Sequence, residues 1–311
     1  VRPETVEELW EMAKNRVDLP GGLLAAISSG SVEPWVEGLA PTDIGYTNLS
    51  DGYLRYTKLV REGGWPTFAP GPTIEPGASD RRVPAMIKRL VVEGDLSPQA
   101  AAQATASGVV YGSALQEAVR SFQVRHGLDG DGRIGPATQS SLGASALDRA
   151  RQIALNLERR RWLKRELSPE RIEVNTAASI MVYWKDGRPV HSNRVVVGSP
   201  ENQTPSLEKE FASVVANPPW RVPAGIARRE ILPRGPAYMA ARDMYMDNGM
   251  VVQRAGPQAA LGYVKFELRD SYAIFLHDTP TKAAFNLSNR QRSHGCVRVQ
   301  GAVEFARMLL A

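Results

Sequence analysis

The stretch Ser293-His294-Gly295-Cys296-Val297-Arg298 contains the single cysteine of this 311-residue chain, and a second histidine, His277, lies upstream of it. A thiol acts as a nucleophile when a nearby base takes its proton and N–H groups hold the oxyanion that forms. An imidazole only two residues from the sulfur seldom reaches it in line. The stretch therefore predicts Cys296 as the nucleophile and His277 as the base.

The residues next to Cys296 predict how an oxyanion would be held. Gly295 has no Cβ, so the chain can adopt φ > 0 there and bring the amides of residues 295 and 296 close to a scissile carbonyl. Ser293 and His294 are assigned positioning roles. The alternative is a structural cysteine, since free cysteines are among the most buried residues. The polar loop 286–292 favours an exposed, reactive thiol.

The stretch from Ile274 to Val299 resembles the signature of the L,D-transpeptidases, cysteine enzymes that remodel bacterial peptidoglycan. Further blocks at 195–198, 203–205, 217–223 and 261–266 resemble those of the large periplasmic subfamily in the same order, so the resemblance covers about residues 145–311. It implies that Cys296 attacks the carbonyl of an L-centre at an L-to-D peptide bond of a stem peptide. The resulting thioester passes to an amine of a neighbouring stem and gives a cross-link, without a cofactor.

The resemblance also implies supporting residues. Asp278 orients His277 through its backbone carbonyl or its carboxylate, and we favour the carbonyl because adjacent side chains of an extended segment point away from each other. Arg298 follows the nucleophile by two residues and can bind a stem carboxylate bidentately; the alternative is a buried ion pair. Thr279 and Trp220 are further candidate substrate-binding residues, although a tryptophan in a β-rich domain is often part of the core.

The N-terminal half predicts the helical part of an α+β multidomain protein. Val6, Leu9, Trp10 and Ala13 fall at i, i+3, i+4 and i+7, and this helical spacing returns near residues 53–60 and 145–166. We predict a helical scaffold of residues 1–70 plus 145–168. Residues 71–144 between them predict a three-helix module that resembles a peptidoglycan-binding domain. Its helices are expected around 83–90 and 115–122, and a third is expected to begin at 135–138. Its G-x-G-x-x-G at 130–135 follows a helix, so it predicts a turn and no dinucleotide site.

Residues 169–311 predict a mostly β catalytic domain. Strand-like segments lie at 171–175, 180–184, 194–197, 212–215, 263–268 and 272–276, and an amphipathic helix ends the chain at 302–309. Residues 221–260 interrupt the strands and resemble the lid of large relatives. This lid segment is shorter than expected, and Tyr263 stands where arginine is expected. Both departures bear on which acceptor enters the cleft.

Charge and hydropathy limit the classes of binding partner that we expect. The net charge of +5 favours anionic partners. The resemblance selects peptidoglycan stem peptides and glycan, with carbapenems and related β-lactams as inhibitors and other wall-synthesis proteins as further candidates; no nucleic acid is expected. No apolar run reaches the roughly 18 residues of a membrane span, and the sequence shows no signal peptide. We therefore expect a mature or trimmed chain, and the resemblance implies the periplasm.

Three alternatives remain open at this stage. Water could meet the thioester, which would make the protein an L,D-carboxypeptidase or endopeptidase. The helical modules alone would suit a non-catalytic wall-binding scaffold with an inert Cys296. Zinc binding by His277, His294 and Cys296 is disfavoured, because only three soft ligands are available and no H-E-x-x-H motif accompanies them. The stem contains two L-to-D bonds, after its first and third residues, and the motif is compatible with both.

Overall fold

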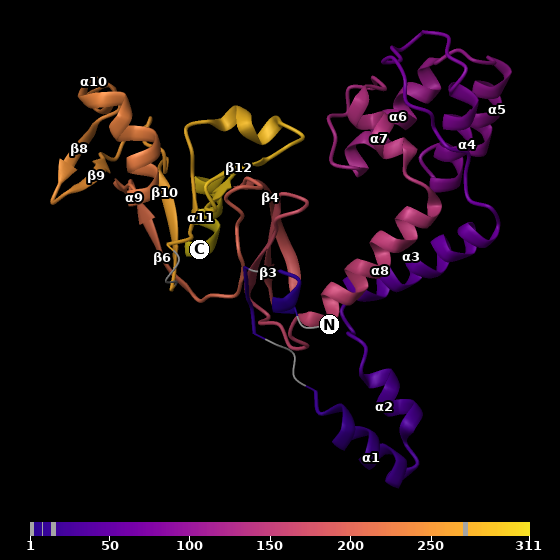
Figure 1. Cartoon of the computed structure of the whole chain (residues 1–311), viewed down its shortest axis with the longest axis horizontal. Coiled ribbons are helices and arrows are strands. Elements are labelled where there is room, and N and C mark those ends of the chain that lie inside the picture. The colour runs from indigo at the N-terminus through magenta and orange to yellow at the C-terminus, as the bar shows by residue number, and fades with distance from the viewer. Residues whose placement is uncertain (1–2, 8, 14–16, 270–272) are drawn as a thin grey trace. The chain divides into compact units, whose positions relative to one another are not determined.

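The computed structural model describes residues 3–7, 9–13, 17–269 and 273–311. Helices and strands are mixed, as the α+β prediction requires (Figure 1). The chain divides into a helical unit, mainly residues 17–166, and a β-rich unit of residues 167–311 together with 7–12. In the described part of the chain, no helix combines the length and apolar character that crossing a bilayer needs.

Two long helices form the scaffold of the helical unit. α3 (Ile44–Arg61) begins after Asp43, whose carboxylate accepts from the amide of Tyr46, and α8 (Ala146–Trp162) begins at a capping box made by Ser145 and Asp148. Ion pairing of Arg160 with Asp43 holds the two helices together. Two shorter helices, α1 (Leu19–Ser29) and α2 (Val32–Gly38), precede α3.

The chain leaves α3 and returns to α8 through a separate helical module, which is thus an insertion between two packed helices. The module contains α4 (Val83–Glu93), α5 (Pro98–Ala106), α6 (Ser113–Arg125) and α7 (Pro136–Gly143). The sequence predicted α4, α6 and α7. It missed α5, whose alanine-rich sequence shows no apolar period. The glycine-rich stretch 130–135 is a turn, in which the side chain of Gln123 bonds the amide of Gly132 at 2.9 Å.

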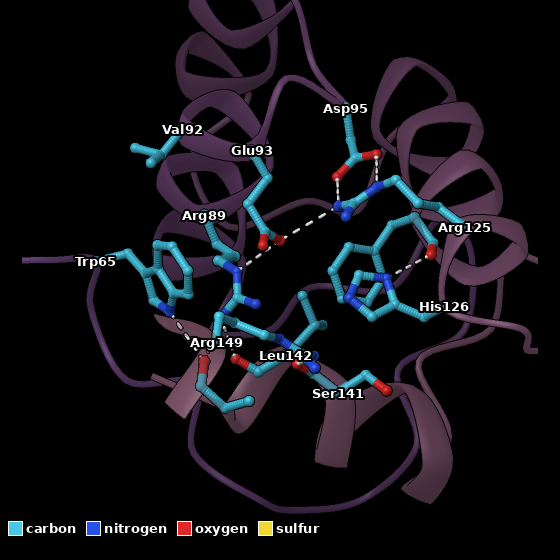
Figure 2. A network of polar contacts seen from close by, with 12 residues as sticks. Trp65, Arg89, Val92, Glu93, Asp95, Arg125, His126, Ser141, Leu142 and Arg149 are labelled. Carbon is cyan, nitrogen blue, oxygen red and sulfur yellow. Dashed lines mark hydrogen bonds and ion pairs between the residues drawn. The ribbon is translucent and has the colours of Figure 1, made fainter. Parts of the chain in front are cut away.

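A buried polar network joins the module to the scaffold (Figure 2). Arg89 and Glu93 have side chains only 1% exposed, and their Nε and Oε2 atoms lie 2.8 Å apart. Arg89 also donates to the carbonyl of Leu142 at 3.1 Å and places its guanidinium 3.7 Å from the ring centroid of Trp65. Glu93 in turn accepts from Arg125 at 3.3 Å. Because buried charges need such partners, α4, α6 and the approach to α8 are held in one arrangement.

The β-rich unit is built on one eight-stranded sheet. Its order is β2-β3-β4-β13-β11-β10-β6, and β12 pairs with β4 off this path. The strands are β2 (Arg171–Asn175), β3 (Ile180–Lys185), β4 (Arg188–Gly198), β6 (Phe211–Ala216), β10 (Val264–Leu268), β11 (Leu276–His277), β12 (Gln291–Ser293) and β13 (Val297–Val299). The strand predicted at 272–276 is shorter and later than expected; its residue 272 lies outside the described residues.

The register of the central strands gives the sheet two different faces. Lys265 of β10 pairs with His277 of β11, which pairs with Arg298 of β13, so these three side chains share one face. The alternate residues, including Phe266 and Val297, point to the other face and form the main core. There α11 (Ala302–Leu310), with Phe305 at its centre, covers the sheet as predicted for the C-terminal helix.

The lid segment folds around a small core of its own. Beginning at β7 (Trp220–Arg221), the chain passes through α9 (Ala224–Ile226), the wide π turn η2 (Ala227–Ile231), η3 (Leu232–Arg234) and α10 (Gly235–Ala240). It returns through β8 (Met244–Asp247) and β9 (Met250–Gln253), and the strands pair in the order β7-β9-β8 (Figure 1). Val222, Ala227, Ile231 and Val251 are buried between them. A short 3₁₀ helix, η4 (Lys282–Asn286), lies later in the unit.

The helix expected from Val6 to Ala13 is absent from the described residues of that stretch. Instead, a 3₁₀ turn, η1, spans Pro3–Thr5, and β1 (Trp10–Glu11) pairs in parallel with β5 (Ser206–Leu207) of the β-rich unit. Residue 8 of the expected helix lies outside the described residues. Pairing with a strand satisfies the backbone groups that a helix would otherwise satisfy, so a tertiary contact overrides the apolar spacing.

Candidate active site

Cys296 lies immediately before β13, at the end of a tight turn. The hydroxyl of Ser293 donates to the carbonyl of Cys296 at 2.5 Å, which closes the turn, and Gly295 has φ +108°. A side chain at position 295 would also come within 3.2 Å of Ile274. The thiol is partly exposed and lies 3.7 Å from the carbonyl of Ala273. The turn thus presents Cys296 on a fixed backbone with access to solvent, as a nucleophile requires.

One of the two amides predicted to donate to an oxyanion has a partner inside the turn. The amide of Gly295 donates to the hydroxyl of Ser293 at 3.2 Å, so this N–H is already used inside the turn. The reason is local: the same serine hydroxyl closes the turn and lies within reach of the glycine amide. The roles of the Gly295 and Cys296 amides as oxyanion donors stay predictions.

His277 is held by strands on both sides and is 5% exposed. Its Nδ1 contacts the backbone carbonyl of Asp278. A carbonyl oxygen can only accept a hydrogen bond, so Nδ1 carries the proton and Nε2 is left with a lone pair. Burial, followed by the positive charge of Arg298, lowers the pKa of His277 to about 4. The imidazole is therefore neutral at pH 7 and able to accept a proton.

The carboxylate of Asp278 turns away from His277, in agreement with the arrangement favoured from the sequence. It is buried, accepts from the amide of Tyr263 at 3.1 Å and forms an ion pair with Lys282. Gly262 has φ +61°, and a Cβ there would lie 2.5 Å from this carboxylate. Asp278 consequently fixes the turn that leads into β10, while its carbonyl orients the imidazole.

Two expected substrate-binding residues, Thr279 and Trp220, are buried and half-buried, and their binding role stays a prediction. The side chain of Thr279 is 2% exposed, and its hydroxyl accepts from the amide of Thr281 at 3.2 Å, so it is an interior residue. Trp220 is half-buried and packs against the small core of the lid segment, as the alternative for this residue anticipated.

Arg298 shares its face of the sheet with His277 and follows Cys296 by two residues. Its guanidinium is largely buried, and burial lowers its pKa. Among the residues that the structure describes, no carboxylate pairs with it, and its Nε atom is buried without a hydrogen-bond partner. The alternative of a structural ion pair is therefore not formed in this part of the chain. An unpaired buried cation of this kind suits an anionic ligand.

His294 contacts the lid segment. Its Nε2 lies 2.8 Å from Oε1 of Glu230, which belongs to the π turn η2. Sequence reasoning missed Glu230, because nothing in the sequence links these two distant positions. It also missed Lys265, although strand alternation with the buried Phe266 places this lysine on the face of His277. Within the described ranges, no three His, Cys, Asp or Glu side chains are grouped to hold a metal ion.

Two segments of the chain match known domain families. Residues 169–311 match the L,D-transpeptidase catalytic domain family, and residues 99–142 match a provisionally named peptidoglycan-binding domain family. A provisionally named L,D-transpeptidase of Haemophilus influenzae is 34% identical over 162 residues, which are 45% of this chain and 33% of that protein. The chain thus spans about a third of the length of this curated relative.

The chain is also similar in part to solved structures, including two that cover different shares of its length. One is the carbamoyl enzyme that Ldtfm forms with avibactam, with 16% identity, a TM-score of 0.31 and 46% of each chain covered. The other is an L,D-transpeptidase from Xylanimonas cellulosilytica, with 19% identity and a TM-score of 0.24, covering 76% of this chain and 90% of that one.

Proposed function

We propose that the protein is a peptidoglycan L,D-transpeptidase with Cys296 as its nucleophile. The match of residues 169–311 to the L,D-transpeptidase catalytic domain family supports this proposal. The observation that carries the proposal is the register of β11 against β13. In this register a buried, neutral His277 lies beside Arg298, on the face of the sheet opposite the core, and the partly exposed Cys296 comes immediately before the strand of Arg298.

In the first step, Nε2 of His277 takes the thiol proton as Sγ of Cys296 attacks the carbonyl of an L-centre in the donor stem. The amide of Cys296 donates to the oxyanion. The tetrahedral intermediate then collapses, the C–N bond to the D-residue breaks, and His277 returns the proton to the departing amine. The product of this step is a thioester on Cys296.

In the second step, an amine of a neighbouring stem attacks the thioester. His277 takes the amine proton, a new C–N bond forms, and the C–S bond breaks. The proton then returns to the sulfur, which restores the starting enzyme. Water in place of the amine gives hydrolysis of the same thioester, so carboxypeptidase or endopeptidase activity is the competing outcome. Both L-to-D bonds of a stem fit this chemistry.

The low pKa of His277 bears on how the thiol is activated. A thiolate–imidazolium pair at rest would need a protonated imidazole, which burial and the neighbouring guanidinium both disfavour. The site therefore suits a neutral thiol and a neutral imidazole at rest, with proton transfer occurring as the carbon–sulfur bond forms. Arg298, which has no carboxylate partner in the described structure, would bind a carboxylate of the stem.

The helical module supports a second proposal, which concerns where the protein acts. Residues 99–142 match a peptidoglycan-binding family, so we infer that the module binds wall polymer. A protein with this substrate would work outside the cytoplasmic membrane, which in this subfamily is the periplasm. Other wall-synthesis proteins are candidate partners.

A carbapenem tests the nucleophile directly, because its strained lactam carbonyl is an acyl donor for a thiolate. We expect intact-mass spectrometry to find one adduct on the wild-type protein and none on Cys296→Ala. His294→Ala serves as the matched control in the same turn and should still form the adduct. An adduct that survives Cys296→Ala would refute the assignment.

A further inference from the structure

The lid segment contacts the cysteine motif through one pair of side chains from distant parts of the sequence. Glu230 lies in the π turn η2 of the lid segment, and its Oε1 atom is 2.8 Å from Nε2 of His294, two residues before the nucleophile. A π turn inside a helical segment is rare and frequently occurs at functional sites. The mechanism above uses neither side chain.

Both partners are presented by ordered backbone. Glu230 lies between Ala227 and Ile231, which are buried in the core of the lid segment. His294 lies between Ser293, which is buried and hydrogen-bonded within the turn, and Gly295. Because both backbones are already fixed, forming this contact orders little beyond the two side chains themselves.

The contact is weak enough to be reversible. The side chains of His294 and Glu230 are 39% and 43% exposed, so solvent screens their attraction. Exposed pairs of this kind change an equilibrium by about two- to fivefold. That range suits a lid that must open for each stem and close over the thioester, since closure excludes water from the reacting centre.

We propose that Glu230 is a positioning residue that holds the lid segment on the cysteine turn and thereby favours an amine acceptor over water. This inference rests on the proposed function and assigns acceptor selection to a specific contact. When the contact is made, the lid segment covers the thioester and forms one wall of the acceptor site. When it is broken, water reaches the thioester more often.

The test measures the ratio of cross-linked to hydrolysed product. Wild-type protein and the variants receive muropeptides as donors and isotopically labelled muropeptides as acceptors, and mass spectrometry counts both products. Glu230→Ala should lower the ratio about two- to fivefold. It should lower the rate of acylation by a carbapenem less than it lowers transfer to the amine. Glu230→Gln keeps an acceptor oxygen and should restore most of the ratio.

Two comparisons separate this role from a general loss of folding. Asp247→Ala removes another acid of the lid segment, one that pairs with Arg221 at 3.4 Å and not with the cysteine turn, and it should leave the ratio unchanged. His294→Ala combined with Glu230→Ala should lower the ratio no further than either change alone, because both remove the same contact.

The outcomes separate this inference from the proposed function. A wild-type protein that forms no thioester overturns the proposed function and this inference with it. A wild-type protein that forms both products, while Glu230→Ala gives the same ratio, overturns the inference alone. A lower ratio in Glu230→Ala that Glu230→Gln restores supports it.

Discussion

Replacing His277 with alanine removes the base of the proposed mechanism, and the pKa of His277 shows how much of this base is active at pH 7. With a pKa of about 4, roughly one imidazole in 10³ is protonated at pH 7, so nearly every molecule can accept the thiol proton. General-base catalysis typically contributes about 10²- to 10⁴-fold. His277→Ala should therefore lower the acylation rate by that factor at pH 7. Raising the pH towards 9.5 should restore part of it, because an ordinary thiol ionises near pH 8.5.

The same pKa fixes the acid side of the wild-type profile. Neutral His277 is the active form, so acylation should persist as the pH falls below 6.5 and decline only as it passes through about 4. The assay is the rate of carbapenem acylation followed by intact mass between pH 3.5 and 9.5. His294→Ala is the control and should keep measurable activity throughout. A larger loss in His294→Ala than in His277→Ala, or a wild-type decline centred near pH 6.5, would refute the reasoning.

Two further predictions concern buried charges. Glu93→Ala leaves Arg89 buried without its carboxylate, which should cost about 3–5 kcal/mol and lower the melting temperature of the helical unit by roughly 6–20 °C in calorimetry. Glu75→Ala, which breaks the exposed pair with Arg133, should shift the melting temperature far less because solvent screens that pair, and equal shifts would contradict this account. Arg298→Gln should raise the KM for stem peptides about 10- to 100-fold, the value of hydrogen bonds to a charged group. Stems with amidated carboxylates should abolish this difference, and an undiminished difference would exclude carboxylate binding.

Local sequence patterns predicted much of the fold. Period-two alternation identified β2, β3 and β10, and helical spacing identified α4, α6 and α11. Each of these elements buries one face in the core of its own unit, so its sequence shows the matching period. The failures lie where local pattern and tertiary context differ. The apolar residues from Val6 to Ala13 have helical spacing, but Trp10 and Glu11 add a short strand to the β-rich unit.

The candidate site was predictable in its chemistry but not in its detailed contacts. Cys296 and His277 could be singled out because a lone thiol in a polar, glycine-containing turn needs a base held at a distance. The hydrogen bond from Gly295 to Ser293 could not be predicted, since it depends on the closure of one turn. The contact of Glu230 with His294 depends on how the lid segment folds back, which periodicity does not encode.

The central claim is that Cys296 forms cross-links between stems, and muropeptide analysis of isolated sacculi tests it most directly. Sacculi are incubated with the wild-type protein or with Cys296→Ala, digested to muropeptides and compared by mass spectrometry. We predict new cross-linked muropeptides with the wild type and none with Cys296→Ala. Identical muropeptides in both samples, or shortened stems without any new cross-link, would contradict the claim.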